Sequence, residues 1–274
     1  MKVEVLCTTM YQSGLDKYKE MNINTDVIFA NQYNNYKYIE NYINGNRVRM
    51  ITTPYRGVGK NRNTALLYSN ADILLFSDDD MVYFDNYKDN IIKAFEELPD
   101  ADIIIFNIGS IGEKSTRRIN NKIKKLNKFN ILNYGFPRVA IKNSSIKKYN
   151  LWVSELFGGG SIYCSGEDNL FLINALNLGL KIYGHPFFIG NVKSGQSTWF
   201  NGFNEKYFFD NGAWLEATFP FFKYVFMLYF TFKFKRKSDI KIIKILKLQY
   251  YGMKAFKNGV SYDRWKKENF NSKQ

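Results

Sequence analysis

The chain has 274 residues, 45% hydrophobic and 18% aromatic, which is enough apolar material for one main domain with a substantial core. Its two cysteines exclude a disulfide framework and favour a reducing, cytoplasmic location, and its single histidine excludes Cys₂His₂ zinc sites. We expect neither a secretion signal nor a membrane-spanning helix, since no apolar stretch reaches the roughly 18 residues that a span needs.

The net charge of +14 is unevenly distributed. Residues 219–274 hold 14 Lys and Arg against 3 Asp and Glu and therefore carry +11, which leaves only +3 for residues 1–218. We divide the chain accordingly into a nearly neutral body, residues 1–218, and a basic, aromatic-rich helical extension, residues 219–274.

Short apolar strands alternate with helices through the first half of the chain. Helices are predicted over residues 61–69 and 85–98. Such alternation predicts an α/β domain with a Rossmann-like, mostly parallel sheet flanked by helices, whose ligands bind beyond the carboxyl ends of the strands. The predicted strands cover residues 2–7, 27–30, 48–51, 73–76 and 103–106.

The second half has fewer clear elements. Residues 113–128 include seven basic side chains and are interpreted as a mobile excursion. Three glycines, residues 158–160, lead to a helix that begins at the Glu167-Asp168 pair and ends at Gly179. A last strand is predicted over residues 182–189.

Three consecutive aspartates, Asp78, Asp79 and Asp80, follow the strand predicted over residues 73–76. Adjacent carboxylates repel one another, and a cation relieves that repulsion. Mg²⁺ and Mn²⁺ take carboxylate oxygens and keep positions open for phosphates. Asp78 and Asp80 are therefore candidates for a metal site that handles a diphosphate. The alternative is a polar turn with a helix cap.

Glu167 and Asp168 are predicted to lie in the first turn of a helix, where the helix dipole favours carboxylates. Taken alone, a structural role is the simpler interpretation of this pair. The three glycines shortly before it let the backbone approach a ligand closely. A carboxylate beside such a surface is a plausible general base.

Four features in this order resemble glycosyltransferase family 2 and its GT-A-fold relatives, over residues 1–200. The resemblance implies a GT-A fold, a nucleotide-diphosphate sugar donor (a UDP-sugar), a Mn²⁺ or Mg²⁺ ion, and inversion by direct displacement. It also makes residues 1–218 a catalytic domain. The features are a strand ending at Thr8-Thr9, Gly59-Lys-Asn-Arg-Asn63, Leu75-Phe-Ser-Asp-Asp-Asp80 and Gly166-Glu-Asp-Asn-Leu-Phe171.

The resemblance also assigns roles to individual residues. Asp80 and Asp78 are the expected metal ligands, with Asp78 or Asp79 nearer the ribose. Asp168 is the expected catalytic base, and Glu167 is expected to orient or contact the acceptor. The residues expected to hold the nucleotide are Thr8, Thr9, Asn31, Gln32, Arg62, Asp78 and Asp79.

Two downstream segments have two interpretations each. His185 lies where some relatives carry a further metal ligand, or it is a buried, hydrogen-bonded strand residue. Residues 197–200 follow a glycine-containing loop and are candidates to cover the donor or acceptor. Trp199 within them either stacks on a sugar ring or belongs to the core.

The extension combines aromatic and basic side chains. Residues 221–232 are aromatic-rich and too short to span a bilayer, and four basic residues follow before residue 238. Ser238 is predicted to cap a helix that fits either an anionic membrane surface or packing on the catalytic domain or a second subunit. Its predicted apolar face is Ile242, Ile243, Leu246, Tyr250 and Met253, with Lys241, Lys244 and Lys247 on another face.

These features together predict a metal-dependent, inverting glycosyltransferase acting on a hydroxyl of a cell-surface glycan or lipid-linked precursor, in the cytoplasm or peripherally at the inner membrane face. A nucleotidyltransferase acting on a sugar phosphate is the neighbouring alternative, and the Glu167-Asp168 pair argues against it. A non-catalytic nucleic-acid-binding protein is the other alternative. The near-neutral body argues against that, so no nucleic-acid partner is expected.

Overall fold

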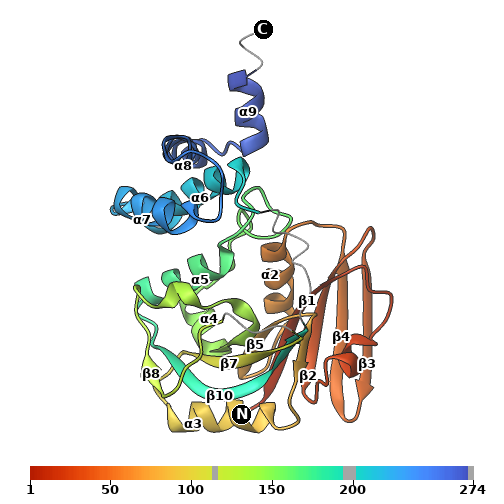
Figure 1. Cartoon of the computed structure of the whole chain (residues 1–274). Helices are drawn as coiled ribbons and strands as arrows, with labels where there is room; N and C mark the ends of the chain where they lie inside the picture. The colour runs from red at the N-terminus through yellow and green to blue at the C-terminus, as the bar shows by residue number, and fades with distance from the viewer. Residues whose placement is uncertain (113–116, 194–201, 271–274) are drawn as a thin grey trace.

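The computed structural model describes residues 1–112, 117–193 and 202–270 (Figure 1). Residues 197–200, including Trp199, and Lys114 of the basic segment lie outside the described residues. A mixed sheet with helices on both faces occupies the first part of the chain, and the C-terminal helices gather beyond one side of it. Within the described ranges, no helix combines the length and apolar character needed to cross a bilayer.

The strands form one sheet in the order β3-β4-β2-β1-β5-β9-β7-β10-β6, with β8 paired to β10. The strands are β1 (Val3–Met10), β2 (Asp26–Gln32), β3 (Lys37–Ile43), β4 (Asn46–Thr53), β5 (Ile73–Asp78), β6 (Met81–Tyr83), β7 (Ile103–Ile111), β8 (Lys124–Lys125), β9 (Val139–Lys142) and β10 (Ile182–Lys193). The helices are α1 (Lys17–Glu20), α2 (Val58–Tyr68), α3 (Tyr87–Glu97), α4 (Asn143–Tyr149), α5 (Glu167–Asn177), α6 (Glu205–Thr218), α7 (Lys223–Lys235), α8 (Ile242–Lys257) and α9 (Tyr262–Phe270), with short 3₁₀ turns η1 (Ile131–Asn133) and η2 (Phe136–Arg138).

The expected α/β class is confirmed, with a sheet more mixed than the sequence suggested. Strands β4, β2, β1 and β5 run parallel, and so do β7 and β10. The chain returns after β7 to place β9 antiparallel between β5 and β7. At the far edge, β3 folds back on β4 through Asn44-Gly45, whose positive φ angles suit a tight hairpin turn.

Each face of the sheet has its own apolar core. Successive side chains of a strand point to opposite faces, so Leu6 and Leu74 face one cluster while Val5 and Leu75 face the other. Helices α2, α4 and α5 cover the first face, and α1 and α3 cover the second (Figure 1). Burial on both sides explains why these strands are continuous apolar runs in the sequence.

The parallel register brings the polar ends of four strands to one edge. Thr8 at the end of β1 pairs with Asp78 at the end of β5, and Thr9 pairs with Asn31 of β2. Asn31 in turn pairs with Thr52 of β4. The sheet thus collects the predicted polar residues at the place where α/β domains bind ligands.

The basic extension is packed against α6 rather than separate from it. Helix α8 crosses α6 so closely that a Cβ on Gly252 would lie 1.9 Å from the carbonyl oxygen of Phe209. Likewise, a Cβ added to Gly212 of α6 would lie 2.0 Å from the carbonyl oxygen of Gln249. The border that we drew at residue 218 therefore falls inside a group of helices that share contacts.

The face of α8 that packs agrees only in part with the predicted one. Met253 is buried as predicted, but Ile242, Ile243 and Tyr250 are exposed, and Ile245 and Leu248 are buried in their place. The cap prediction was also wrong, because α8 begins at Ile242 and the Ser238 hydroxyl donates instead to the Phe203 carbonyl oxygen at 2.8 Å. Because lysines lie on several sides of α8, the sequence alone is compatible with two apolar stripes. The crossing with α6 buries the stripe that contains Ile245 and Leu248.

This crossing predicts that Gly252→Ala destabilises the protein, whereas the same change in an exposed helix is stabilising. Glycine to alanine in an exposed helix stabilises by about 1 kcal/mol, whereas overpacking costs about 1–3 kcal/mol. We expect Gly252→Ala to lower the free energy of unfolding in a denaturant titration. Lys247→Ala, at an exposed position of the same helix, is the control and should have little effect. A stabilised Gly252→Ala protein would contradict the close crossing.

Candidate active site

A buried arginine joins the two acidic motifs. Arg62 of α2 is 4% exposed, and its guanidinium donates to Asp78 Oδ1 at 3.0 Å and to Glu167 Oε1 at 2.7 Å. Burial opposes its charge, but Asp78 and Glu167 outweigh that penalty, so the pKa of Arg62 is raised further above its ordinary value. One side chain therefore ties the end of β5 to the start of α5.

The position of Arg62 follows from how α2 is held. Its guanidinium carbon lies 4.5 Å from the centroid of the Phe136 ring, so an aromatic face supports the charge. At the start of α2, the Val58 amide donates to the carbonyl oxygen of Gly159 at 2.9 Å. The loop of three glycines, residues 158–160, thus contacts the α2 N-terminus directly.

Gly158, the first of these glycines, also adjoins the acidic pair. It has φ of +104°, and a Cβ there would lie 2.8 Å from the Glu167 carboxyl carbon and 2.5 Å from Val58 Cγ1. Only glycine accepts both that backbone conformation and that crowding. The sequence indicated that the backbone of this loop comes close to another group, and in the structure that group is the Glu167 side chain.

Thr8 and Thr9 hold the first two aspartates of the triplet. The Thr8 hydroxyl donates to Asp78 Oδ1 at 3.1 Å, and the Thr9 hydroxyl donates to Asp79 Oδ2 at 2.5 Å. Both threonines are buried at the end of β1. They fix the orientation of the carboxylates at the edge of the sheet.

Asp80 is the most exposed member of the aspartate triplet. It reaches the surface, yet partial loss of hydration, followed by repulsion from Asp78 and Asp79, raises the pKa of Asp80 to about 6. A divalent cation fits carboxylates in this situation. Among the described residues, no three side chains of the Asp, Glu, His and Cys types already converge as a metal cage.

Asp168 lies next to Glu167 in the first turn of α5. Its Oδ1 accepts bonds from the backbone and side chain of Asn169 at 2.7 and 3.0 Å, and its Oδ2 lies near Gly135. Burial, followed by the charge of Glu167, raises the pKa of Asp168 to about 7. A carboxylate with that pKa can both accept and release a proton near neutral pH.

Asn31 and Gln32 are buried and bonded within the protein. The Asn31 amide donates to the Gln12 carbonyl oxygen at 2.9 Å and to the Thr52 hydroxyl at 3.1 Å. The Gln32 side-chain oxygen accepts from the Gly57 amide at 3.0 Å, next to the start of α2. Both side chains therefore hold the loops that surround the edge of the sheet.

His185 does not lie with the aspartate triplet. It is 1% exposed, its Nε2 is 3.3 Å from Glu97 Oε2, and its ring packs against Phe106 and Phe187. The backbone amide of Lys193, eight residues further along the same strand, donates to the Asp80 carbonyl oxygen, and eight extended residues cover up to about 26 Å. The burial and contacts of His185 fit the second of its two interpretations, a buried, hydrogen-bonded strand residue.

Two residues of α6 support the acidic pair, and the sequence did not reveal them. Asp210, 2% exposed, accepts from the Cys164 amide at 2.9 Å, and Trp214 donates from its indole nitrogen to the Gly166 carbonyl oxygen at 3.1 Å. They fix the turn just before Glu167. The available signal for Asp210 was an acidic residue directly after two phenylalanines in a helical stretch.

The comparisons agree with this geometry. The sequence profile described as glycosyl transferase family 2 matches residues 29–152, which include Arg62 and the aspartate triplet. The chain contains a glycosyl transferase family 2 domain. The predicted resemblance is confirmed, and glycosyltransferase is the enzyme class of this domain. No curated protein matches the chain in sequence.

Solved structures of TarS from S. aureus share the fold. TarS 1-349 in complex with UDP-GlcNAc has a TM-score of 0.63 and 13% identity, with 96% of this chain and 93% of that chain covered. The complex with UDP gives a TM-score of 0.61 at 13% identity and the same coverage. A longer TarS structure has a TM-score of 0.58 and 13% identity, with 98% of this chain but only 46% of that one covered. The likeness confirms the expected GT-A type of fold.

The Arg62 bridge makes a direct prediction about stability. Removing one partner of a buried charge network costs about 3–5 kcal/mol, so Arg62→Met should lower the free energy of unfolding by that order. Arg47, which pairs with Glu40 at the exposed edge of the sheet, is the matched control. Arg47→Met should have little effect. Equal losses in the two variants, measured by denaturant unfolding, would show that Arg62 does not carry the bridge.

Proposed function

We propose that this protein is an inverting glycosyltransferase that moves a sugar from a UDP-sugar to an acceptor hydroxyl. The observation that carries the proposal is the Arg62 bridge, which holds Asp78 of the triplet and Glu167 of the acidic pair on one buried cation. A donor at the end of β5 would then lie next to Asp168. The UDP-GlcNAc and UDP complexes of the TarS structures support a UDP-sugar as the donor class.

The donor side of the site is assigned to the ends of the parallel strands. Thr8, Thr9, Asp78 and Asp79 are proposed to contact the nucleotide, with Asp79 or Asp78 near the ribose. Asn31 and Gln32 are proposed to shape the nucleotide cleft through the loops that they hold. A Mn²⁺ or Mg²⁺ ion held by Asp80, together with Asp78, would neutralise charge on the leaving diphosphate.

The proton transfer is assigned to Asp168. Its carboxylate takes the proton from the acceptor hydroxyl as the oxygen attacks the anomeric carbon, and the nucleoside diphosphate leaves from the opposite face. No protein nucleophile takes part, so the configuration inverts in a single displacement. Glu167, held by Arg62, is proposed to orient the acceptor, with Asp210 and Trp214 fixing the turn that carries both carboxylates.

The acceptor is proposed to be a hydroxyl of a cell-surface glycan or of a lipid-linked precursor. The enzyme would then work in the cytoplasm, at the inner face of the cell membrane. A reaction with a hydroxyl, rather than with water, requires that the acceptor displaces solvent around Asp168. Asp168 is half-buried, which is compatible with that requirement.

Replacing the base tests the proposal. Asp168→Asn should leave the affinity for UDP-GlcNAc nearly unchanged and lower turnover by roughly two to four orders of magnitude, the usual contribution of a positioned base. Turnover is measured as UDP released in the presence of a panel of hydroxyl acceptors. Glu167→Gln is the comparison variant, because it changes the neighbouring carboxylate, which is assigned to orienting the acceptor instead of to proton transfer. If Glu167→Gln abolished transfer and Asp168→Asn did not, the two roles would be exchanged.

The pH profile gives a second readout for the same residue. A base works in its ionised form, so with a pKa near 7 the wild-type kcat/KM should fall about tenfold for each pH unit below 7. Asp168→Asn should lack this acidic limb. A wild-type profile that stays flat down to pH 5 would argue against Asp168 as the base.

A further inference from the structure

Helix α7 is apolar on two opposite sides. Its inner side packs on the neighbouring helices, with the Phe230 ring 5.5 Å from Trp214 and the Thr231 hydroxyl donating to Gln249 Oε1 at 2.6 Å. Its outer side is also apolar and faces away from the protein. A helix that is hydrophobic all round is ordinarily buried in a core or in lipid.

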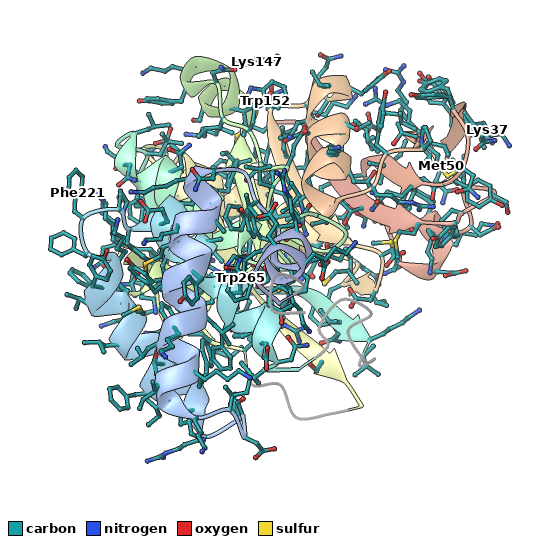
Figure 2. The ribbon with its side chains drawn as sticks, turned by 90° about the horizontal axis from the view of Figure 1, so that it is seen from above. Lys37, Met50, Lys147, Trp152, Phe221 and Trp265 are labelled. Carbon is teal, nitrogen blue, oxygen red and sulfur yellow. The ribbon has the colours of Figure 1, made fainter. Side chains whose placement is uncertain are left out.

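We define the outer face of α7 as Val225, Leu228 and Phe232 of the helix together with Phe221, which lies in the turn before the helix begins at Lys223. The spacing of three and four residues places Val225, Leu228 and Phe232 along one stripe of the helix. Phe221 is 93% exposed, Val225 66% and Phe232 62%. Figure 2 shows Phe221 at the outer edge of the molecule, with its ring pointing away from the other helices. The exposed residues beside the stripe are Phe222, Tyr224 and Tyr229.

Basic side chains lie at one end of this outer face. Arg236 continues the stripe one turn after Phe232, and Lys237 and Lys241 follow between α7 and α8. Within the described ranges, Arg236 and Lys241 form no ion pair with a carboxylate, whereas Lys244 pairs with Glu205. An exposed apolar stripe beside unneutralised cations is complementary to a surface that is apolar inside and anionic outside.

We propose that the outer face of α7 docks on an anionic membrane, with the stripe inserted among the acyl chains and the basic residues at the α7–α8 turn against lipid headgroups. The 13 residues of α7 extend about 20 Å, less than the roughly 30 Å of a bilayer core, so the helix lies in the interface. A second copy of this chain is the less suitable occupant, because pairing two such faces brings together two extensions with a charge of +11 each.

This surface rests on the proposed location at the membrane face and deepens it, but its test does not depend on the transferase reaction. Membrane docking requires no nucleotide sugar, metal or acceptor, so it is measured without them. A failure of membrane binding would leave the donor and base assignments unaffected. Conversely, loss of catalysis in the Asp168 variant would not change binding to vesicles.

The test is co-sedimentation of the full chain with vesicles. We expect the protein to sediment with phosphatidylglycerol–phosphatidylcholine vesicles at low salt, to bind much less at high salt, and to bind poorly to phosphatidylcholine alone. The double variant Val225→Asp with Phe232→Asp should reduce the partition coefficient at least tenfold. Phe129→Asp, at an apolar side chain that is 87% exposed elsewhere on the molecule, is the matched control and should bind as the wild type does.

A charge variant tests the second half of the surface. Each basic side chain near an anionic membrane contributes about fivefold, so Arg236→Glu with Lys241→Glu should weaken binding about twentyfold or more. Lys37→Glu with Lys147→Glu is the matched control, since both lysines are exposed on the other part of the chain (Figure 2). If the apolar double variant fails to fold, as judged by thermal unfolding, this charge pair decides the outcome.

Two results would overturn the proposal. The first is the absence of specific binding: the wild-type protein remains in the supernatant with anionic vesicles at low salt, or the control substitutions reduce binding as much as the outer-face substitutions do. The second is an outer-face variant that turns an oligomer into a monomer in sedimentation velocity while vesicle binding stays unchanged. That second result would assign the face to a second copy of the chain.

Discussion

A charged guanidinium that is almost wholly removed from water must be paired, and this requirement at Arg62 organises the site. Its two partners, Asp78 and Glu167, come from parts of the chain that are about 90 residues apart. Because the guanidinium itself is buried, moving either motif away would leave this charge without one of its partners. The end of β5 and the start of α5 therefore form one rigid arrangement, with the threonines of β1 completing its other side.

The C-terminal helices are part of that arrangement. Asp210 and Trp214 of α6 bond the turn before Glu167, and α6 is in turn crossed at close range by α8. Changes in the packing of the basic extension can thus reach the acidic pair through α6. If α7 docks on a membrane, the same helices connect the membrane surface with the catalytic centre, which suits an enzyme whose acceptor lies at that surface.

Much of this could be predicted from the sequence where the pattern had a single physical solution. The buried parallel strands are continuous apolar runs, and their polar ends had to meet at one edge. Strand β3 was missed because it is largely exposed and lacks alternation, although Asn44-Gly45 was a usable hairpin signal. The Arg62 bridge, the location of His185 and the packed face of α8 depend on contacts between distant segments, which no local pattern contains.

The aspartate triplet is proposed to hold the metal ion and the nucleotide of the donor beside the acidic pair. Calorimetric titration of UDP with and without Mn²⁺, on the wild type and on Asp80→Asn, decides whether it does. We expect Mn²⁺-dependent binding in the wild type and a loss of at least about tenfold in Asp80→Asn, since a charged oxygen ligand is removed. Thermal unfolding should show that the variant still folds. The same Mn²⁺-dependent affinity in both proteins would remove Asp80 from the donor site.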